Sequence, residues 1–249
     1  IAELMYSDFA FVAGDQIFNQ VAKTRYVFGG NARIPLVIRG QQGTGRGNAA
    51  THSQSLESLF MHIPGLKVVC PSTPADAAGL LRTAIRDDNP VCFFEHKVLY
   101  ATKGEVPDDP DFCIPFGKAD IKREGTDVTI VANLLYVKRA LEAADELAKE
   151  GISAEVIDPR TLVPFDYDTV AESVKKTGRL VVVHEAHQNN GWGAQVVSQV
   201  GQMVFPYLDA APVHIGAKAC PLPFNLGLEQ AVLPSVKDIV DACKASLYR

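Results

Sequence analysis

Residues 34–54 read IPLVIRGQQGTGRGNAATHSQ, a strand-like apolar run followed by a glycine-rich segment and a histidine. Its apolar start at 34–38 is typical of a buried strand, and the four glycines between residues 40 and 47 predict a loop with a permissive backbone directly after that strand. Helical apolar spacing follows at 56–60, so His52 lies where the loop meets a helix. Ligands of open α/β sheets bind at such loops, which favours a ligand site here. The alternative interpretation is a flexible surface loop whose histidine has no function.

Strand and helix patterns alternate along most of the chain, which predicts an α/β fold with parallel crossovers. The expected elements of the first half are strands at 1–6, 34–38, 66–70 and 91–95 and helices at 8–26, 56–60 and 75–86. Those of the second half are strands at 128–132, 154–157, 180–183 and 213–215 and helices at 137–149, 167–176, 192–204 and 236–247. Residues 100–115 are rich in proline and aspartate and lack an apolar period, so we expect a linker between two domains there.

The composition is that of a globular protein without a strongly basic or membrane-spanning segment. The 249 residues are 47% hydrophobic and 21% charged, with a formal net charge of −5 and a pI near 5.7. An acidic chain does not favour a nucleic-acid partner, and the apolar runs are too short to cross a bilayer. The five cysteines are scattered and never in CxxC spacing, so we interpret them as reduced thiols of a cytoplasmic protein.

The chain resembles, over its whole length, the β subunit of the thiamine-diphosphate-dependent E1 component of 2-oxo acid dehydrogenase complexes. The block THSQSLESLFMHIPGLKVVCPSTPADAAGLLRTAIRDDNPVCFFEH, which starts at Thr51, is closely similar. The likeness continues through GKADIKREGTDVTIVA, EVIDPRTLVPFD and KKTGRLVVVHEA to LEQAVLPSVKDIV. It implies a pyrimidine-binding, transketolase-like parallel-sheet domain at 1–115 and a transketolase C-terminal α/β domain at 116–249. Because the chain starts at Ile1 within a predicted strand, we expect the first domain to be N-terminally incomplete.

By resemblance, His52 matches the active-site histidine that positions intermediates and moves protons during reductive acylation of lipoamide. An imidazole suits that role because its unperturbed pKa is about 6.5. Phe9 matches the aromatic residue that packs against the aminopyrimidine ring of thiamine diphosphate; Tyr6 is a rival for that role, and plain core packing is the alternative. Two other histidines are weaker candidates, because His62 reads as structural and the pair at 184–185 (His-Glu) as packing or interface residues.

The resemblance also implies a monovalent-cation site, usually for potassium, at Leu36, Ala84, Ile85, Asp87 and Asn89. Carbonyl groups at a helix C-terminus, together with acidic and amide side chains, form the all-oxygen site that a hard cation needs. A plain Asp/Asn helix stop before a proline is the alternative interpretation of the same residues.

The chain accounts for only part of the cofactor site of this family. The sequence lacks the GDG motif that holds Mg²⁺ and the diphosphate, a motif that belongs to the α subunit in heterotetrameric E1 enzymes. The glutamate that contacts the pyrimidine is expected upstream of Ile1, and Glu3 is not that residue. We therefore expect thiamine diphosphate to be shared with the α subunit.

These features predict a β subunit that pairs with E1 α in an α2β2 heterotetramer and passes an acyl group to the E2 dihydrolipoyl acyltransferase. Pyruvate, branched-chain 2-oxo acids and acetoin all stay open as substrates. A fragment of a stand-alone transketolase-like or deoxyxylulose-phosphate synthase enzyme is one alternative, and a non-catalytic scaffold that binds an E2 core is another. We expect the aromatic residues Trp192, Phe205, Tyr207 and Phe224 to form either a β–β contact of the second domain or part of its core.

Overall fold

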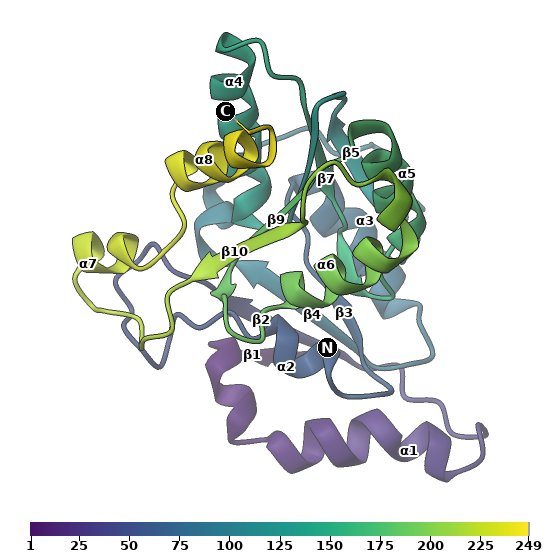
Figure 1. Ribbon diagram of the computed structural model, residues 1–249. Helices are drawn as coiled ribbons and strands as arrows, with labels where there is room; N and C mark the ends of the chain where they lie inside the picture. Colours follow the sequence, from purple (N-terminus) through teal and green to yellow (C-terminus); the bar gives the residue numbers. More distant parts are fainter. Residues whose placement is uncertain (249) are drawn as a thin grey trace.

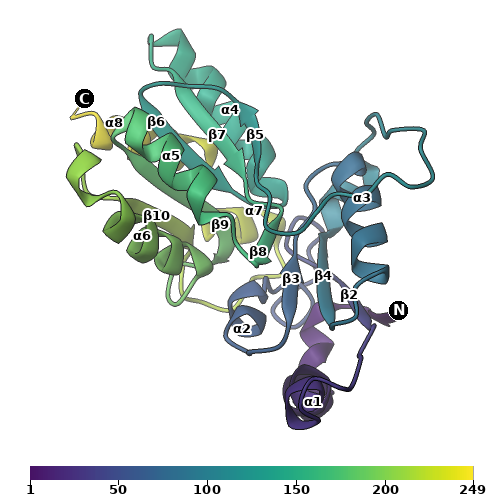
Figure 2. The same cartoon turned by 90° about the vertical axis from the view of Figure 1, so that its right-hand side faces the viewer.

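The computed structural model describes residues 1–248 and shows two α/β domains packed side by side (Figures 1 and 2). The first sheet has the order β1-β2-β4-β3-β8, with β1 (Ala2–Leu4), β2 (Val37–Gln42), β4 (Val91–His96), β3 (Lys67–Val69) and β8 (Thr161–Val163). The second sheet has the order β10-β9-β6-β7-β5, with β10 (Val213–Ala217), β9 (Leu180–His187), β6 (Val128–Ala132), β7 (Ala154–Asp158) and β5 (Asp120–Arg123). In both sheets the strands are parallel, except that β8 and β5 run antiparallel to their neighbours at one edge.

Helices cover both sheets, and local sequence signals fix several of their ends. The helices are α1 (Ala22–Val27), α2 (Glu57–Met61), α3 (Pro74–Ile85), α4 (Leu135–Lys149), α5 (Tyr167–Thr177), α6 (Trp192–Met203), α7 (Leu226–Ala231) and α8 (Val236–Ser246). The Thr73 side chain caps α3 by accepting the N–H of Asp76, and Pro74 occupies the first turn. Ser235 and Asp238 form a capping box at the start of α8.

Most of the predicted strands and helices are confirmed to within a few residues, but the sequence patterns miss β5, β8 and α7. The strand β8 lies in the second half of the sequence, yet it pairs with β3 of the first sheet, where Val163 stands opposite Val68. In Figure 2 this strand stands at the junction of the two domains. It therefore ties the second half of the chain to the first sheet.

The single helix predicted at 8–26 is wrong in its first part. A 3-10 helix (Ser7–Phe11) comes first, the chain then bends, and a π-helical segment (Gln16–Val21) leads into α1. The 3-10 helix packs on β2, where the Ser7 hydroxyl donates to the carbonyl of Gln41 at 3.1 Å. Because this contact holds the segment against the sheet, the helix does not run straight from residue 8.

The glycine loop begins later than the sequence suggests, because β2 continues through Gly40. A Cβ at Gly40 would collide with the Ser7 hydroxyl, so this glycine serves the packing of the 3-10 helix on the strand. The first glycine of the loop itself is Gly43, which has a φ of +90°.

One apolar core runs across the boundary between the domains. Phe94 of the first domain belongs to the same buried cluster as Val131 and Trp192 of the second. The stretch at 100–115 is irregular, but it is not a free linker, because Ile114 is buried against α3. The two domains therefore form one packed unit, and side chains of the second domain can serve a site in the first.

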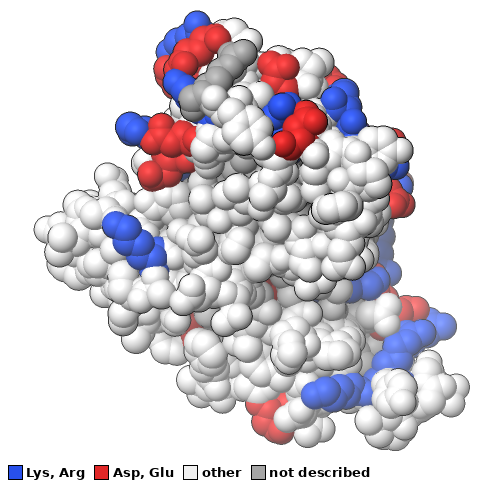
Figure 3. Space-filling model, viewed as in Figure 1, with Lys and Arg blue, Asp and Glu red and all other residues white. Residues whose placement is uncertain are grey.

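Charge is unevenly distributed over the face shown in Figure 3. Charged side chains gather over α4 and α8 at the top, and basic ones near α1 at the lower right, while much of the area between them carries no charge. None of the helices formed by residues 1–248 is both long and apolar enough to cross a membrane.

Candidate active site

His52 lies at the carboxyl edge of the first sheet, in the loop between β2 and α2. Its ring centroid is 5.5 Å from that of Tyr6 and 5.2 Å from that of Phe9, with interplanar angles of 73° and 83°. Tyr6 and Phe9 follow β1, which is parallel to β2, so the ends of two neighbouring strands bring the three rings together. Phe9 is 41% exposed, so the cluster is open to solvent on one side.

The hydroxyl of Thr51 is a polar neighbour of the His52 imidazole. Its Oγ lies 2.9 Å from Nδ1 of His52. A hydroxyl can donate to an unprotonated Nδ1 or accept from a protonated one, so this contact is compatible with either state of the ring. A half-buried imidazole that can hold or release a proton is suited to general acid–base work.

Lys97 supports the backbone of the His52 loop. Its side chain is fully buried, and its Nζ donates to the carbonyl of His52 at 2.5 Å and to the Asn48 side chain at 3.3 Å. The ammonium also lies 4.6 Å from the centroid of the Tyr6 ring, as in a cation–π contact. Burial lowers the pKa of Lys97, and nearby carboxylates oppose that shift. No local pattern singled out Lys97, although a lysine two residues after the buried run at 91–95 is a signal that could have found it.

Two buried carboxylates of the second domain also reach the glycine loop. Glu185 in β9 accepts a hydrogen bond from the N–H of Thr44 at 2.7 Å. Glu229 in α7 accepts one from the N–H of Gly45 at 3.1 Å. From the sequence, Glu185 is expected in packing or an interface and Glu229 is not singled out, because no local pattern connects either residue with the loop.

His184 is a buried packing residue, as predicted. Its ring centroid lies 5.2 Å from that of Trp192, and its Nδ1 donates to the carbonyl of Ala186 at 3.0 Å. Burial lowers the pKa of His184 to about 4, so the ring is neutral near pH 7.

The aromatic face predicted for the second domain is divided between core and surface. Trp192 is 2% exposed and belongs to the core, so a role for it in a β–β contact is wrong. The other three members are exposed, namely Phe205, Tyr207 and Phe224. The difference arises because Trp192 begins α6 and faces His184, whereas the other three lie outside the long helices of the domain.

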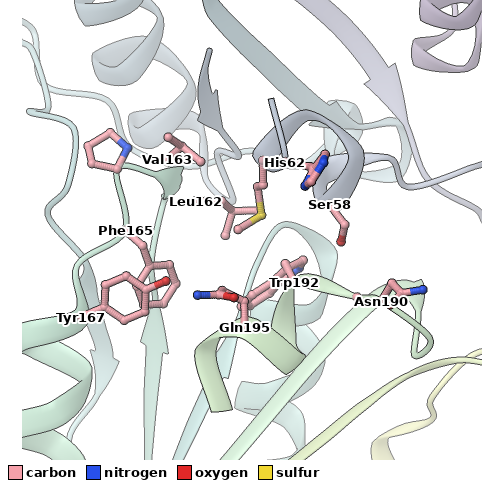
Figure 4. Close-up of a pocket in the computed structure, with 12 residues that line it drawn as sticks. Ser58, His62, Leu162, Val163, Phe165, Tyr167, Asn190, Trp192 and Gln195 are labelled. Carbon is pink, nitrogen blue, oxygen red and sulfur yellow. The ribbon is translucent and has the colours of Figure 1, made fainter. Parts of the chain in front are cut away.

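A groove of about 480 Å³ opens between the two domains (Figure 4). Phe165, Tyr167 and Trp192 form an aromatic wall on the side of the second domain, and α2 closes the other side. His62, which the sequence suggested to be structural, is exposed and lines this groove. His52 does not line it, so the groove and the aromatic cluster around His52 are separate features.

The residues predicted to hold a monovalent cation lie together at the opposite end of β2. Leu36 directly precedes the strand, and its carbonyl accepts the N–H of Val91 at 2.9 Å, which brings it close to the loop after α3. In that loop, Oδ1 of Asp87 accepts the backbone and side-chain N–H groups of Asn89 at 2.8 and 2.9 Å, and Oδ2 pairs with the ammonium of Lys67. Burial alone would raise the pKa of Asp87, but these donors hold it below its usual range.

The oxygen atoms of this loop are mainly backbone carbonyls. The carbonyl of Ala84 accepts the N–H of Asp87 at 3.3 Å, and Ile85 follows at the exposed end of α3. Within residues 1–248, no three His, Cys, Asp or Glu side chains gather in the way a metal site requires. A cation held here would therefore bind carbonyls and an amide beside the Asp87 carboxylate, a donor set that suits a hard ion.

Comparison with known proteins first defines the class. Residues 1–103 match the family described as transketolase, pyrimidine binding domain, and residues 117–239 match the family described as transketolase, C-terminal domain. The solved structure of a split gene transketolase, an inactive β4 tetramer, aligns with a TM-score of 0.79 and 26% identity over 99% of this chain and 75% of that chain. The predicted transketolase-like α/β architecture is confirmed.

The more similar relatives then define the family. The β subunits of acetoin:2,6-dichlorophenolindophenol oxidoreductase from Cupriavidus necator and Bacillus subtilis are 54% and 50% identical over 99% and 96% of this chain, which covers 73% and 70% of their lengths. The pyruvate dehydrogenase E1 component subunit β of Rhizobium meliloti is 48% identical over the whole chain, which covers 54% of that protein. The chain therefore belongs to the family of E1 β subunits of thiamine-dependent pyruvate and acetoin dehydrogenases.

Proposed function

We propose that this chain supplies the β half of an E1 active site, where a 2-oxo acid is decarboxylated or acetoin is cleaved and the acyl group passes to the lipoamide of E2. The observation that carries the proposal is the aromatic cluster of His52, Tyr6 and Phe9 at the carboxyl edge of a parallel sheet. It occurs in a chain about half identical to acetoin and pyruvate dehydrogenase β subunits. This kinship favours an E1 subunit over a fragment of a stand-alone transketolase-like enzyme and over a non-catalytic scaffold.

The aromatic cluster fits the pyrimidine half of thiamine diphosphate. Phe9 presents a partly exposed ring, and an aromatic surface orients a flat heterocycle without requiring a hydrogen bond. Thiamine diphosphate, when bound, supplies the electron sink for cleavage of the carbon–carbon bond. We assign the Mg²⁺ and diphosphate ligands to the α subunit.

In this proposal His52 is the residue of the chain that moves protons close to the substrate. Its ring packs edge-on against the exposed Phe9, and the residue is only partly buried. The buried ammonium of Lys97 holds the His52 carbonyl, so the backbone is fixed while the imidazole stays available for proton transfer. Fixing the backbone limits the positions that the ring can adopt, which favours a productive geometry.

We further propose that potassium binds at the loop formed by Leu36, Ala84, Ile85, Asp87 and Asn89. The support is that the carbonyl end of α3 and the start of β2 converge there, next to the Asp87 carboxylate and the Asn89 amide. A bound ion would join the two segments and so stabilise the start of the strand that leads to His52.

Assembly with an α subunit and with a second β chain is supported by exposed apolar side chains. Around α1, the exposed residues are Phe11, Val12, Tyr26, Val27 and Phe28. On the second domain, they form two separate groups, Phe205 and Tyr207 after α6 and Phe224, Leu226 and Leu228 at α7. Apolar side chains that gather on a surface favour contacts between proteins. We therefore propose an α2β2 assembly that serves E2, and we place it in the cytoplasm because all five cysteines are free thiols.

Reconstitution tests the proposed function. The full-length protein is co-expressed with an E1 α subunit of a related acetoin enzyme, one already shown to be active with its own β subunit, and turnover is measured with acetoin, pyruvate and branched-chain 2-oxo acids. Acetoin is the first substrate to try, because two acetoin-enzyme β subunits are 54% and 50% identical to the chain. We expect turnover with the α subunit and none without it. A stable α/β complex that turns over none of these substrates would contradict the proposal.

A further inference from the structure

The carboxylate of Glu185 crosses the domain boundary and joins both ends of the loop that carries His52. One oxygen, Oε1, accepts the N–H of Thr44 at 2.7 Å and faces the hydroxyl of Ser55 at 3.3 Å. Thr44 opens the loop, and Ser55 lies three residues after His52. A single side chain of the second domain therefore bridges the two ends of the loop, which also meet directly where the N–H of Gly43 donates to the carbonyl of Gln54 at 3.4 Å.

The other carboxylate oxygen of Glu185 is held by His96 at the end of β4. Its Oε2 lies 2.9 Å from Nε2 of His96. Because Nδ1 of the same ring accepts the N–H of Val98 at 3.2 Å, Nε2 carries the hydrogen and donates to Glu185. The carboxylate is thus fixed by the first sheet on one side while it fixes the loop on the other.

The backbone around Glu185 is shaped to allow this close approach. Gly43 has a φ of +90°, and a Cβ there would collide with the His96 ring and lie 2.9 Å from Oε1 of Glu185. Only glycine leaves room for the carboxylate beside the loop. The next residue but one, Gly45, is held by Glu229 of α7, so two consecutive N–H groups of the loop point at carboxylates of the second domain.

The charges around the loop are balanced by buried partners. Burial alone would raise the pKa of Glu185, but the hydrogen bonds from His96 and Thr44 hold it below its usual range, so the group is ionised near pH 7. The buried ammonium of Lys97 lies in the field of this carboxylate and donates to the His52 carbonyl. The same loop is therefore held by Glu185 of the second domain and by Lys97 of the first domain.

We propose that Glu185 is a positioning residue of the second domain, which fixes the 43–55 loop and thereby sets the place of His52 in the active site. The proposal rests on the proposed function for its catalytic consequence, whereas the fixing of the loop is a property of the chain alone. It gives the second domain a direct part in the site formed by the first.

The test compares Glu185→Gln with Glu155→Gln. Glu155 is a matched control, because it is an equally buried carboxylate of the second domain that pairs with Lys176 and does not touch the loop. In the chain alone, amide hydrogen exchange in the 43–55 peptides should speed up in Glu185→Gln and stay unchanged in Glu155→Gln. Unchanged exchange in Glu185→Gln would overturn the proposal, whether or not any substrate is turned over.

The catalytic arm uses the α/β complex. We expect Glu185→Gln to lower kcat for acyl transfer about 10- to 100-fold with little change in KM, since misplacing a catalytic group by about 1 Å costs this much. In a His52→Ala background the same change should have almost no further effect. An equal loss in both backgrounds would show a general structural role and contradict the proposal. If Glu185→Gln does not fold, Glu185→Asp, which keeps the charge but shortens the side chain, should give the same pattern of exchange.

Discussion

The two ends of β2 carry the two candidate sites, and they are held together in opposite ways. At the carboxyl end, the His52 loop depends on distant partners, since Thr44 and Glu185 are 141 residues apart. At the amino end, the cation loop depends on partners within the first domain, since Asp87 and Asn89 are two residues apart, Lys67 is 20 residues from Asp87, and Leu36 is 55 residues from its partner Val91. Breaking the contact between Glu185 and the His52 loop should therefore loosen the carboxyl end of β2 and leave the amino end unchanged.

The largest effect is expected at the domain contact, from Gly43→Ala. The new methyl group would meet the His96 ring in addition to straining a backbone with φ of +90°, so we expect a loss of stability of about 3 kcal/mol or more. Gly30→Ala is the matched control, because Gly30 has φ of +86° but open space around it. It should cost only about 1–2 kcal/mol, which is the backbone strain alone. Equal unfolding midpoints for the two variants would mean that the contact at Gly43 is loose.

The next effect is expected at the amino end, from Asp87→Asn. This change removes the charge that pairs with Lys67 and weakens the acceptor of Asn89, so stability should fall by about 2 kcal/mol. Denaturant unfolding measures the loss. Hydrogen exchange in the 43–55 loop should stay at the wild-type rate, because the hydrogen bonds of Asp87 stay within its own end of the strand. Faster exchange there would show that the two ends are coupled.

The same contrast between near and distant partners decides what the sequence could predict. The buried strands at 91–95 and 128–132 and the Pro74 helix have strong local patterns, and they are found close to their predicted places. The break near Ser7 and the strand β8 depend on contacts with remote segments, so no local pattern marks them.

Among the candidate site residues, His52, Phe9 with its rival Tyr6, and the proposed cation loop were named from the sequence through its family resemblance, and they stay predictions. The structure places Tyr6 and Phe9 together against His52, so the two are neighbours in one cluster. Glu185 and Lys97 were not predicted from the sequence, because their partners lie 141 and 45 residues away from them. A carboxylate buried by tertiary packing leaves no periodic signal in the sequence.

A smaller loss of stability is expected when the pH is lowered, because of His184 in β9. His184 has a pKa of about 4 in the folded chain and about 6.5 when unfolded, so the unfolded state binds the extra proton as the pH falls below 6.5. This residue should therefore take away about 1.4 kcal/mol of stability between pH 7.5 and pH 5.5. In His184→Asn the difference in stability between these two pH values should shrink by that amount. An unchanged difference would show that the ring is already protonated or solvated in the folded state.

The smallest effect is expected from potassium. At about five times its dissociation constant, an ion that binds only the folded state adds about 1 kcal/mol of stability. Thermal unfolding in potassium chloride should therefore have a higher midpoint than in the chloride of a large organic cation at equal ionic strength. The increase should vanish in Asp87→Asn. Equal midpoints in the two salts would contradict a cation site at this loop.

The assignment of the active site to the His52 loop is tested by comparing two histidines of the first domain in the reconstituted α/β complex. His52 stands in the aromatic cluster, whereas His62 is exposed at the interdomain groove. His52→Ala should lower the rate of acyl transfer to lipoamide by about 10²-fold or more, the range of general acid–base catalysis, while leaving the unfolding midpoint nearly unchanged. His62→Ala should keep the wild-type rate. Equal rates for both variants and the wild-type complex would contradict the assignment of the active site to the His52 loop.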